Sequence, residues 1–167
     1  MPRAVPRTVP AAAPVAGPDE APVLDPVLDF MRLLWSVEHR LERASKRMAA
    51  TLGVTGPQRL VLRLVDRFPD VSAGRLAHLA QLHPSTLTGI LRRLEAKRLL
   101  DRSVDPADSR RARLRVLPRA RALIAARVGT VEHAVTAVLR AATPADLART
   151  RHVLQAVAAA LDDQHAR

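Results

Sequence analysis

The sequence predicts a mainly α-helical fold with one small β-hairpin. Apolar residues recur at helical spacing through most of the chain after Asp25. The spacing changes to two only between Leu99 and Val116, and a turn-forming stretch from Asp105 to Ser109 divides that segment. These observations indicate several helices and a single two-stranded ribbon.

The first segment lacks helical periodicity and is expected to be a flexible tail. Seven of the 13 prolines occur at every fourth position from 2 to 26. Each proline removes a backbone donor and favours an extended conformation in the residue before it, so residues 1–24 are assigned to a Pro-rich tail. A basic arm that reaches a polyanion through Arg3 and Arg7 is the functional alternative to a solvated tail with no fixed role.

Residues 25–54 are predicted to form a long helix. Apolar residues from Leu24 to Leu52 follow one stripe, and Val27, Phe30 and Leu33 widen it to more than one face. A helix that is apolar on several faces must be buried by more than one neighbour. That neighbour is either another part of the chain or a second subunit.

The following residues predict three helices, of which the last two are short. Thr55 can cap the first of them. Pro57, which follows it closely, is tolerated in a first helical turn. Ser72 can cap the second, and Pro84 opens the third after a break of three residues at 81–83. Two short helices with such a link are the signal of a helix-turn-helix unit.

The helix that starts at Pro84 has distinct inner and outer faces. Its inner stripe is apolar and consists of Leu87, Ile90, Leu91 and Leu94. Positions two residues out of phase lie about 200° around the helix, so they face outward. They are Ser85, Thr88, Gly89 and Arg92.

A two-stranded ribbon follows, with arginines on one face. Leu99–Val104 is the first expected strand, and in the second Ala112, Leu114 and Val116 alternate with Arg111, Arg113 and Arg115. Pro118 is expected to start one long helix that continues past Val131 to Leu139. The last helix is expected to begin at Thr143-Pro144-Ala145-Asp146, which supplies a cap, a proline and an acid.

The charge balance favours a polyanionic partner. The formal net charge is +11, and 25 of the 27 cationic residues are arginines, whose planar fork suits phosphate and guanine edges. Residues 75–121 contain 12 cations and four acids, a net +8, whereas an even spread would give about +3. Double-stranded DNA is therefore the first expected partner.

Several other classes of function are disfavoured. The chain has no cysteine, which removes disulfides, thiolate metal sites and cysteine nucleophiles. It has no Gly-rich phosphate loop, nucleophile elbow or His-Glu-x-x-His motif, and its six histidines form no His-x-x-x-His pair. No enzyme activity, metal or cofactor is expected. Without an apolar span or signal sequence, a soluble cytoplasmic protein without membrane contact is predicted.

Four stretches together resemble the MarR family of bacterial winged helix-turn-helix regulators. They are Leu52-Gly53-Val54-Thr55-Gly56-Pro57-Gln58, Leu76-Ala77-His78-Leu79, the helix from Pro84 to Glu95, and Asp105-Pro106-Ala107-Asp108-Ser109-Arg110-Arg111. The resemblance covers roughly Asp25 to Leu161. It implies a homodimer with dimerisation helices at 25–54 and 118–167, a winged DNA-binding lobe at 55–117 and a palindromic DNA site.

The predicted DNA contacts follow from this arrangement. The Pro84 helix would enter the major groove with its N-terminus first, and the flanking helix and ribbon would contact phosphates. By resemblance, Arg110 would enter the minor groove, oriented by Asp108. The predicted DNA-binding residues are Arg75, Pro84, Ser85, Thr86, Thr88, Gly89, Arg92, Arg93, Asp108, Arg110, Arg111 and Arg113.

The sequence departs from the family pattern at both ends of the reading helix. His83 stands where Ser is frequent as the cap, and Arg98 stands where Gly usually ends the helix. A less well capped helix and backbone strain at Arg98 are therefore expected.

The resemblance also implies a small aromatic or anionic effector that releases the DNA. Trp35, His39 and Arg59 are the candidate effector-binding residues, against the alternatives of a core tryptophan and a surface histidine. The predicted function is a sequence-specific transcriptional regulator, most simply a repressor. A non-specific architectural DNA-binding protein is the main alternative. A partner-binding module that uses only the dimerisation helices is a further one, and it leaves the arginine ribbon unexplained.

Overall fold

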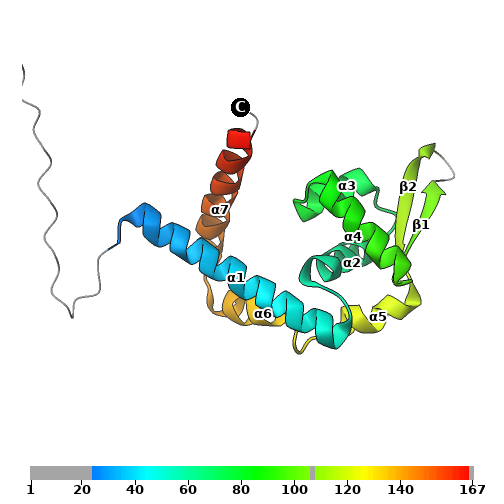
Figure 1. The fold of residues 1–167 in the computed structure, drawn as a ribbon, viewed down its shortest axis with the longest axis horizontal. Helices are drawn as coiled ribbons and strands as arrows, with labels where there is room; N and C mark the ends of the chain where they lie inside the picture. Colours follow the sequence, from blue (N-terminus) through cyan, green and yellow to red (C-terminus); the bar gives the residue numbers. More distant parts are fainter. Residues whose placement is uncertain (1–23, 106–107, 166–167) are drawn as a thin grey trace, which may run out of the picture. The chain divides into compact units, whose positions relative to one another are not determined.

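The computed structural model describes residues 24–105 and 108–165, and the side chains of 24–104 and 112–163 among them. The Pro-rich tail predicted at 1–24 lies almost wholly outside these residues. The chain divides into two units, residues 1–37 and 38–167. The elements, in chain order (Figure 1), are α1 (Pro26–Leu52), α2 (Gly56–Arg67), α3 (Ala73–Ala80), α4 (Pro84–Ala96), β1 (Leu100–Asp105), β2 (Asp108–Val116), α5 (Pro118–Ala125), α6 (Val131–Ala141) and α7 (Pro144–His165).

The fold class is as predicted, with helices throughout and one antiparallel hairpin. The buried core belongs to the lobe formed by α2, α3, α4, the hairpin and α5, where α2 packs against α3, α4, β2 and α5. The inner stripe predicted for α4 is buried in this core. Its fully buried side chains include Val61, Leu62, Leu76, Leu94 and Leu114.

Local capping explains where the lobe helices start. Thr55 and Gln58 form a capping box, because the Thr55 hydroxyl accepts from the Gln58 N–H while the Gln58 amide accepts from the Thr55 N–H. The Ser72 hydroxyl accepts from the Arg75 N–H at 3.3 Å and caps α3. The helix starts predicted from these residues are confirmed.

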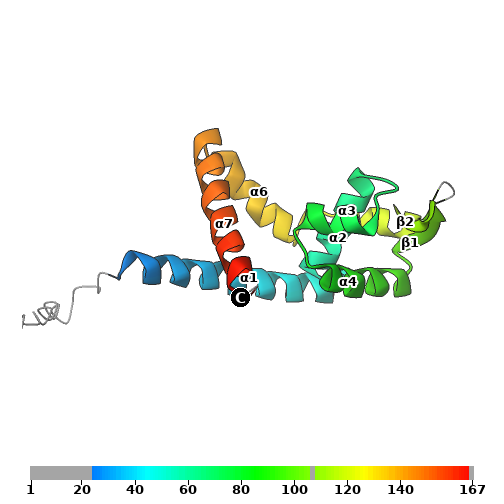
Figure 2. The same cartoon turned by 90° about the horizontal axis from the view of Figure 1, so that it is seen from above.

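The hairpin pairs Leu100 with Val116 and Arg102 with Leu114, with an irregularity after Val104. Val71, in the segment between α2 and α3, makes an isolated antiparallel bridge to Leu114. Leu114 is fully buried, so this bridge joins the base of the hairpin to the core of the lobe. The hairpin extends outward from that base in both views (Figures 1 and 2).

The prediction of one long helix from Pro118 is wrong. The segment forms two helices, α5 and α6, separated by residues 126–130 (Figure 1). Ala126 is extended, with ψ of 130°, and Gly129 has a left-handed φ of 74°. Thr130 then caps α6 by accepting from the His133 N–H at 3.2 Å.

The helices outside the lobe expose much apolar surface. Met48 is the buried residue of α1, and α6 has none among the residues that the structure describes. The exposed large side chains of these helices are Val27, Leu28, Met31, Leu33, Trp35, Val37, Leu41, Val135, Val138, Leu139, Val153, Leu154 and Leu161. None of the described helices is both long and apolar enough to span a membrane.

Candidate nucleic-acid interface

The outer face of α4 is accessible. Ser85, Thr86 and Thr88 are exposed, as are Arg92 and Arg93 in the later turns. The Thr88 hydroxyl donates to the Pro84 carbonyl at 2.9 Å, which keeps this side chain close to the helix. The face therefore presents short polar groups at the N-terminal half and two guanidinium groups further along, a sequence of groups suited to a DNA groove.

Gly89 lies in the middle of this face. A Cβ built on Gly89 has no atom within 4 Å, so the fold does not require glycine there. In a helix interior glycine lowers stability relative to alanine by about 1 kcal/mol. A glycine that packing does not need is consistent with close approach of a ligand to this face.

The N-terminus of α4 is capped by His83, contrary to the expectation of a poor cap. The His83 Nδ1 accepts from the Ser85 N–H at 3.4 Å and lies 2.7 Å from the Ser85 hydroxyl. An imidazole nitrogen thus replaces the usual serine oxygen. At the other end, Arg98 has a φ of 53°, so the predicted backbone strain is confirmed.

The neighbouring cations lie on α3 and the hairpin. Arg75 is exposed in the first turn of α3, and the half-buried Arg113 is paired with Ser103 across the hairpin. Pro84 is exposed at the start of α4. The structure thus brings the described members of the predicted DNA-binding set onto one lobe.

Arg115 does not belong to the row of phosphate-binding arginines that the alternation predicts. Its Nε and Nη2 donate to the two carboxylate oxygens of Asp70 at 2.6 and 3.0 Å. These hydrogen bonds and the charge of Asp70 raise the pKa of Arg115. The pair ties the hairpin to the turn between α2 and α3.

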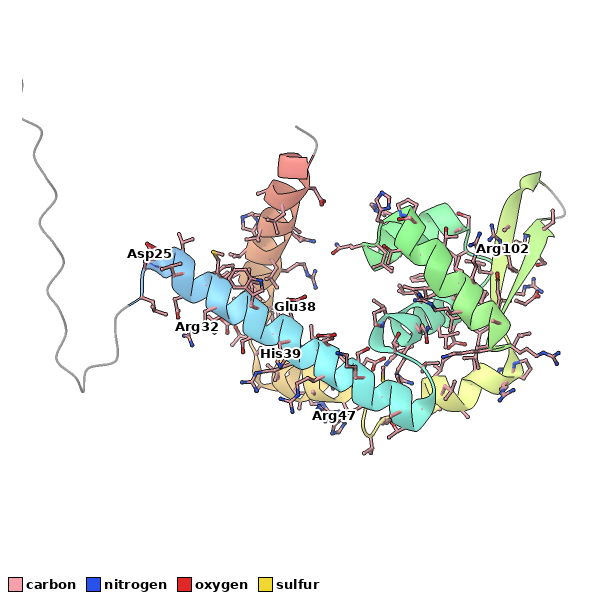
Figure 3. The ribbon with its side chains drawn as sticks, viewed as in Figure 1. Asp25, Arg32, Glu38, His39, Arg47 and Arg102 are labelled. Carbon is pink, nitrogen blue, oxygen red and sulfur yellow. The ribbon has the colours of Figure 1, made fainter. Side chains whose placement is uncertain are left out.

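Arg102 is a cation of this surface that the sequence analysis left out. It is exposed on β1, although it shares the face of Leu114 (Figure 3). The sequence analysis gave this position no role, and only the structure shows that Arg102 is exposed although its cross-strand partner Leu114 is fully buried. Three predicted DNA-binding residues, Asp108, Arg110 and Arg111, have side chains outside the described part of the chain.

The effector-binding candidates have different surroundings. Trp35 is 61% exposed on α1, and His39 is exposed on the same helix (Figure 3). Arg59 is only 1% exposed and donates to the backbone carbonyls of residues 123, 124 and 126 and to Glu132. This geometry favours a structural role for Arg59 over direct contact with a ligand.

Glu132 receives two cations at one oxygen. Arg59 Nε lies 2.9 Å and Arg63 Nη1 3.4 Å from its Oε1. Burial opposes ionisation of Glu132, but its own backbone N–H and the two guanidinium groups outweigh burial, so its pKa is below the usual value. Within the described residues, no group of His, Asp or Glu is arranged to hold a metal ion.

A protein-family model matches the region that contains this surface. Residues 52–111 match the model described as MarR family. That range starts at the end of α1 and includes α2, α3, α4, β1 and the start of β2. No curated relative matches the chain.

Solved structures show the same fold over most of the chain. The crystal structure of the S. aureus MepR–DNA complex matches with a TM-score of 0.66 and 17% identity, covering 78% of this chain and 97% of that one. PcaV from Streptomyces coelicolor, in complex with its natural ligand, matches with a TM-score of 0.64 and 20% identity, and the match covers 84% of this chain and 99% of that one. A mutant MarR from E. coli complexed with operator DNA matches with a TM-score of 0.62 and 20% identity, and the match covers 78% of this chain and 94% of that one. Residues 52–111 thus match the MarR family model, and most of the chain has the fold of these solved structures.

Proposed function

We propose that the protein is a sequence-specific DNA-binding regulator that acts as a homodimer on a palindromic site and represses transcription there. The observation that carries this proposal is the outer face of α4. Short polar side chains, an unhindered Gly89 and two arginines share it, on a lobe whose hairpin adds further cations. In helix-turn-helix proteins, the second helix of the pair reads base edges in the major groove.

Selection of random duplexes with the purified protein tests this function. A palindrome with half-sites about 34–36 Å apart is expected, since a two-fold dimer presents two reading helices one helical turn apart. Specific binding should exceed non-specific binding by more than about 10³. Comparable binding of all duplexes would instead support the architectural alternative. Increased transcription of a reporter carrying the selected site would contradict repression.

The proposal of a homodimer rests on the exposed apolar side chains of α1, α6 and α7. Val27, Leu28 and Trp35 of α1 are 65%, 57% and 61% exposed, and Val138 of α6 is 68% exposed. Large apolar side chains left exposed along a helix mark an interaction site, and each of these helices carries some. We commit to a second copy of this chain as the partner.

A charge on the apolar face of α1 should weaken the dimer. For Leu28→Asp, we expect dimer dissociation at concentrations where the unchanged protein is dimeric, because an unpaired carboxylate would be buried at the interface. Sedimentation equilibrium measures the change. Arg43→Ser alters an exposed polar position of the same helix and serves as the control. A Leu28→Asp protein as dimeric as the control would count against this face.

The hairpin should contact DNA through Arg110, which the sequence resemblance places in the minor groove. For Arg110→Ala, we expect weaker binding with an intact dimer. The slope of log affinity against log salt should fall by about 0.9 per contact, or about 1.8 per dimer. Binding titrations at several salt concentrations measure it, with Arg43→Ala as the control. An unchanged slope would remove Arg110 from the interface.

An effector site is the remaining part of the proposal. A pocket of about 610 Å³ lies between α2 and the α5–α6 segment, and its lining includes Arg63, Arg127, His133 and Arg140. These cations suit a small anionic ligand, and PcaV, a similar fold, is a protein solved with its natural ligand. Thermal shift and DNA release with aromatic acids test this part. Neither stabilisation nor release by any of them would favour a regulator without such an effector.

A further inference from the structure

A buried cation of the lobe, Arg59, contacts the start of α6. Arg59 belongs to α2, which packs in the lobe, and its side chain is 2% exposed. Its hydrogen-bond partners lie at the end of α5, at Ala126 and in the first turn of α6, 64 to 73 residues further along the chain. Arg59 therefore bridges two regions that are distant in sequence.

The guanidinium group contacts this segment at four points. Nε donates to Glu132 Oε1 at 2.9 Å, and Nη1 donates to the Leu123 carbonyl. Nη2 donates to the carbonyls of Ile124 and Ala126 at 3.2 and 2.6 Å. Three backbone acceptors at the end of α5 and one carboxylate in the first turn of α6 thus share a single side chain.

These contacts replace hydrogen bonds of a continuous helix. In an α-helix, the carbonyls of residues 123, 124 and 126 would accept from the N–H groups of residues 127, 128 and 130. The extended Ala126 and the left-handed Gly129 prevent that pattern. Arg59 satisfies the carbonyls that the break leaves without helical partners, so it stabilises the break.

The break determines the direction in which the chain leaves the lobe. α5 packs on α2, whereas α6 and α7 carry exposed apolar residues for the proposed dimer. A change in the angle at residues 126–130 would therefore move one reading helix relative to the other. Two half-sites about 34–36 Å apart require that separation to be held within narrow limits.

We propose that Arg59 is a positioning residue for DNA recognition, which locks the α5–α6 break and thereby sets the separation of the two reading helices. The inference rests on the proposed function, because it needs a dimer that reads two half-sites. Arg59 does not touch DNA in this arrangement. It acts through the direction of α6.

Arg59→Lys tests the proposal because lysine keeps the charge but loses the planar fork that reaches several acceptors at once. Duplexes with fixed half-sites and a variable spacer would be selected with each protein. The unchanged protein should prefer one spacer length. The variant should accept a wider or shifted range and bind the original site about tenfold more weakly, as expected for a typical coupling between sites.

A measurement without DNA separates this inference from the proposed function. The chain has no cysteine, so Gly74→Cys introduces a single attachment point per subunit. Gly74 is exposed on α3, and a Cβ there has no atom within 4 Å. Pulsed EPR of spin labels at this position measures the distance between the two lobes. We expect one narrow distance distribution for the otherwise unchanged dimer and a broader or shifted one after Arg59→Lys.

Gly129→Ala provides a second variant that leaves Arg59 in place. Nothing lies within 4 Å of the added Cβ, so the change acts on the backbone, where a φ of 74° disfavours alanine. It should alter the spacer preference and the label distance as Arg59→Lys does. If Arg59→Lys does not fold, Gly129→Ala decides the outcome.

The matched control is Arg67→Gln, which removes an exposed guanidinium of the same helix α2 whose described contact is the Phe68 ring and not Glu132 or an α5 carbonyl. It should leave both readouts unchanged. Folded dimers of Arg59→Lys and Gly129→Ala with the original label distance and spacer preference would overturn the inference. If the unchanged protein selects no duplex, the proposed function fails, while the label distances still test whether Arg59 holds the lobes.

Discussion

Gly89→Glu should weaken specific DNA binding at least about 30-fold without lowering the stability of the protein. Gly89 lies on the outer face of α4, and a side chain there meets no other atom of the protein within 4 Å. Because glutamate forms helices better than glycine, the folded state should gain up to about 1 kcal/mol. The same side chain would occupy the space between α4 and the groove and add a negative charge near the phosphates.

The expected loss of DNA-binding free energy is doubled because each dimer carries two copies of the substitution. Each disrupted position in a specific complex costs about 1–3 kcal/mol, so two cost about 2–6 kcal/mol and lower the affinity at least about 30-fold. Fluorescence anisotropy with the selected duplex measures binding, and thermal unfolding followed by circular dichroism measures stability. Both should be recorded at one protein concentration, since a dimer unfolds in a concentration-dependent way.

Gly89→Gln is the matched control because it adds nearly the same bulk without the charge. A loss shared by both variants reflects steric exclusion, and any extra loss in Gly89→Glu reflects repulsion by phosphates. The excess should shrink with rising salt, which screens charges. Gly89→Glu protein that binds the selected duplex with unchanged affinity would show that α4 does not enter the groove.

Arg59→Met should have the largest effect on stability. Methionine fills part of the volume but donates no hydrogen bond, so three carbonyls at the end of α5 and the Glu132 carboxylate lose their partner. Unsatisfied buried acceptors and the loss of one member of a buried ion pair together predict a loss of about 2–4 kcal/mol, reduced because Glu132 is partly exposed to solvent. Urea unfolding at fixed protein concentration measures the free energy.

A double-mutant cycle separates the Arg59–Glu132 pair from the backbone contacts. Glu132→Gln should cost less in the Arg59→Met background than in the unchanged protein, because its partner is already absent. Arg63→Met, at a side chain that is 48% exposed, is the control and should change stability by less than about 0.5 kcal/mol. Equal losses of unfolding free energy for Arg59→Met and Arg63→Met would show that the buried hydrogen bonds of Arg59 do not stabilise the fold more than an exposed ion pair does.

Much of the lobe could be predicted from local sequence. A capping residue and the helix it starts lie within three residues of each other, as Thr55 with Gln58 and Ser72 with Arg75 show. The apolar stripe of α4 and the alternation of the hairpin likewise repeat over a few residues. The outer face of α4 could therefore be predicted from the sequence alone, and the residues predicted to lie on it are exposed.

Other features could not be predicted because they depend on residues far apart in the chain. Arg115 seemed equivalent to its neighbours by alternation, but it is bound by Asp70, 45 residues away. Arg102 carries no signal in the sequence, and the structure leaves it exposed opposite the buried Leu114. His83 seemed a poor cap by residue type, while its ring nitrogen reaches Ser85.

By itself, the sequence determined the starts of the lobe helices, the inner and outer faces of α4, the arginine-rich ribbon and the family resemblance, because each depends on the order of neighbouring residues. Tertiary structure decided where the segment after Pro118 breaks and what Arg59 does. The apolar pattern of a helix continues through residues 126–130. In the structure, however, the guanidinium of Arg59 donates to the carbonyls of residues 123, 124 and 126 in place of helical N–H groups. Only the folded chain brings that side chain to the break, so the direction of α6 is a property of packing.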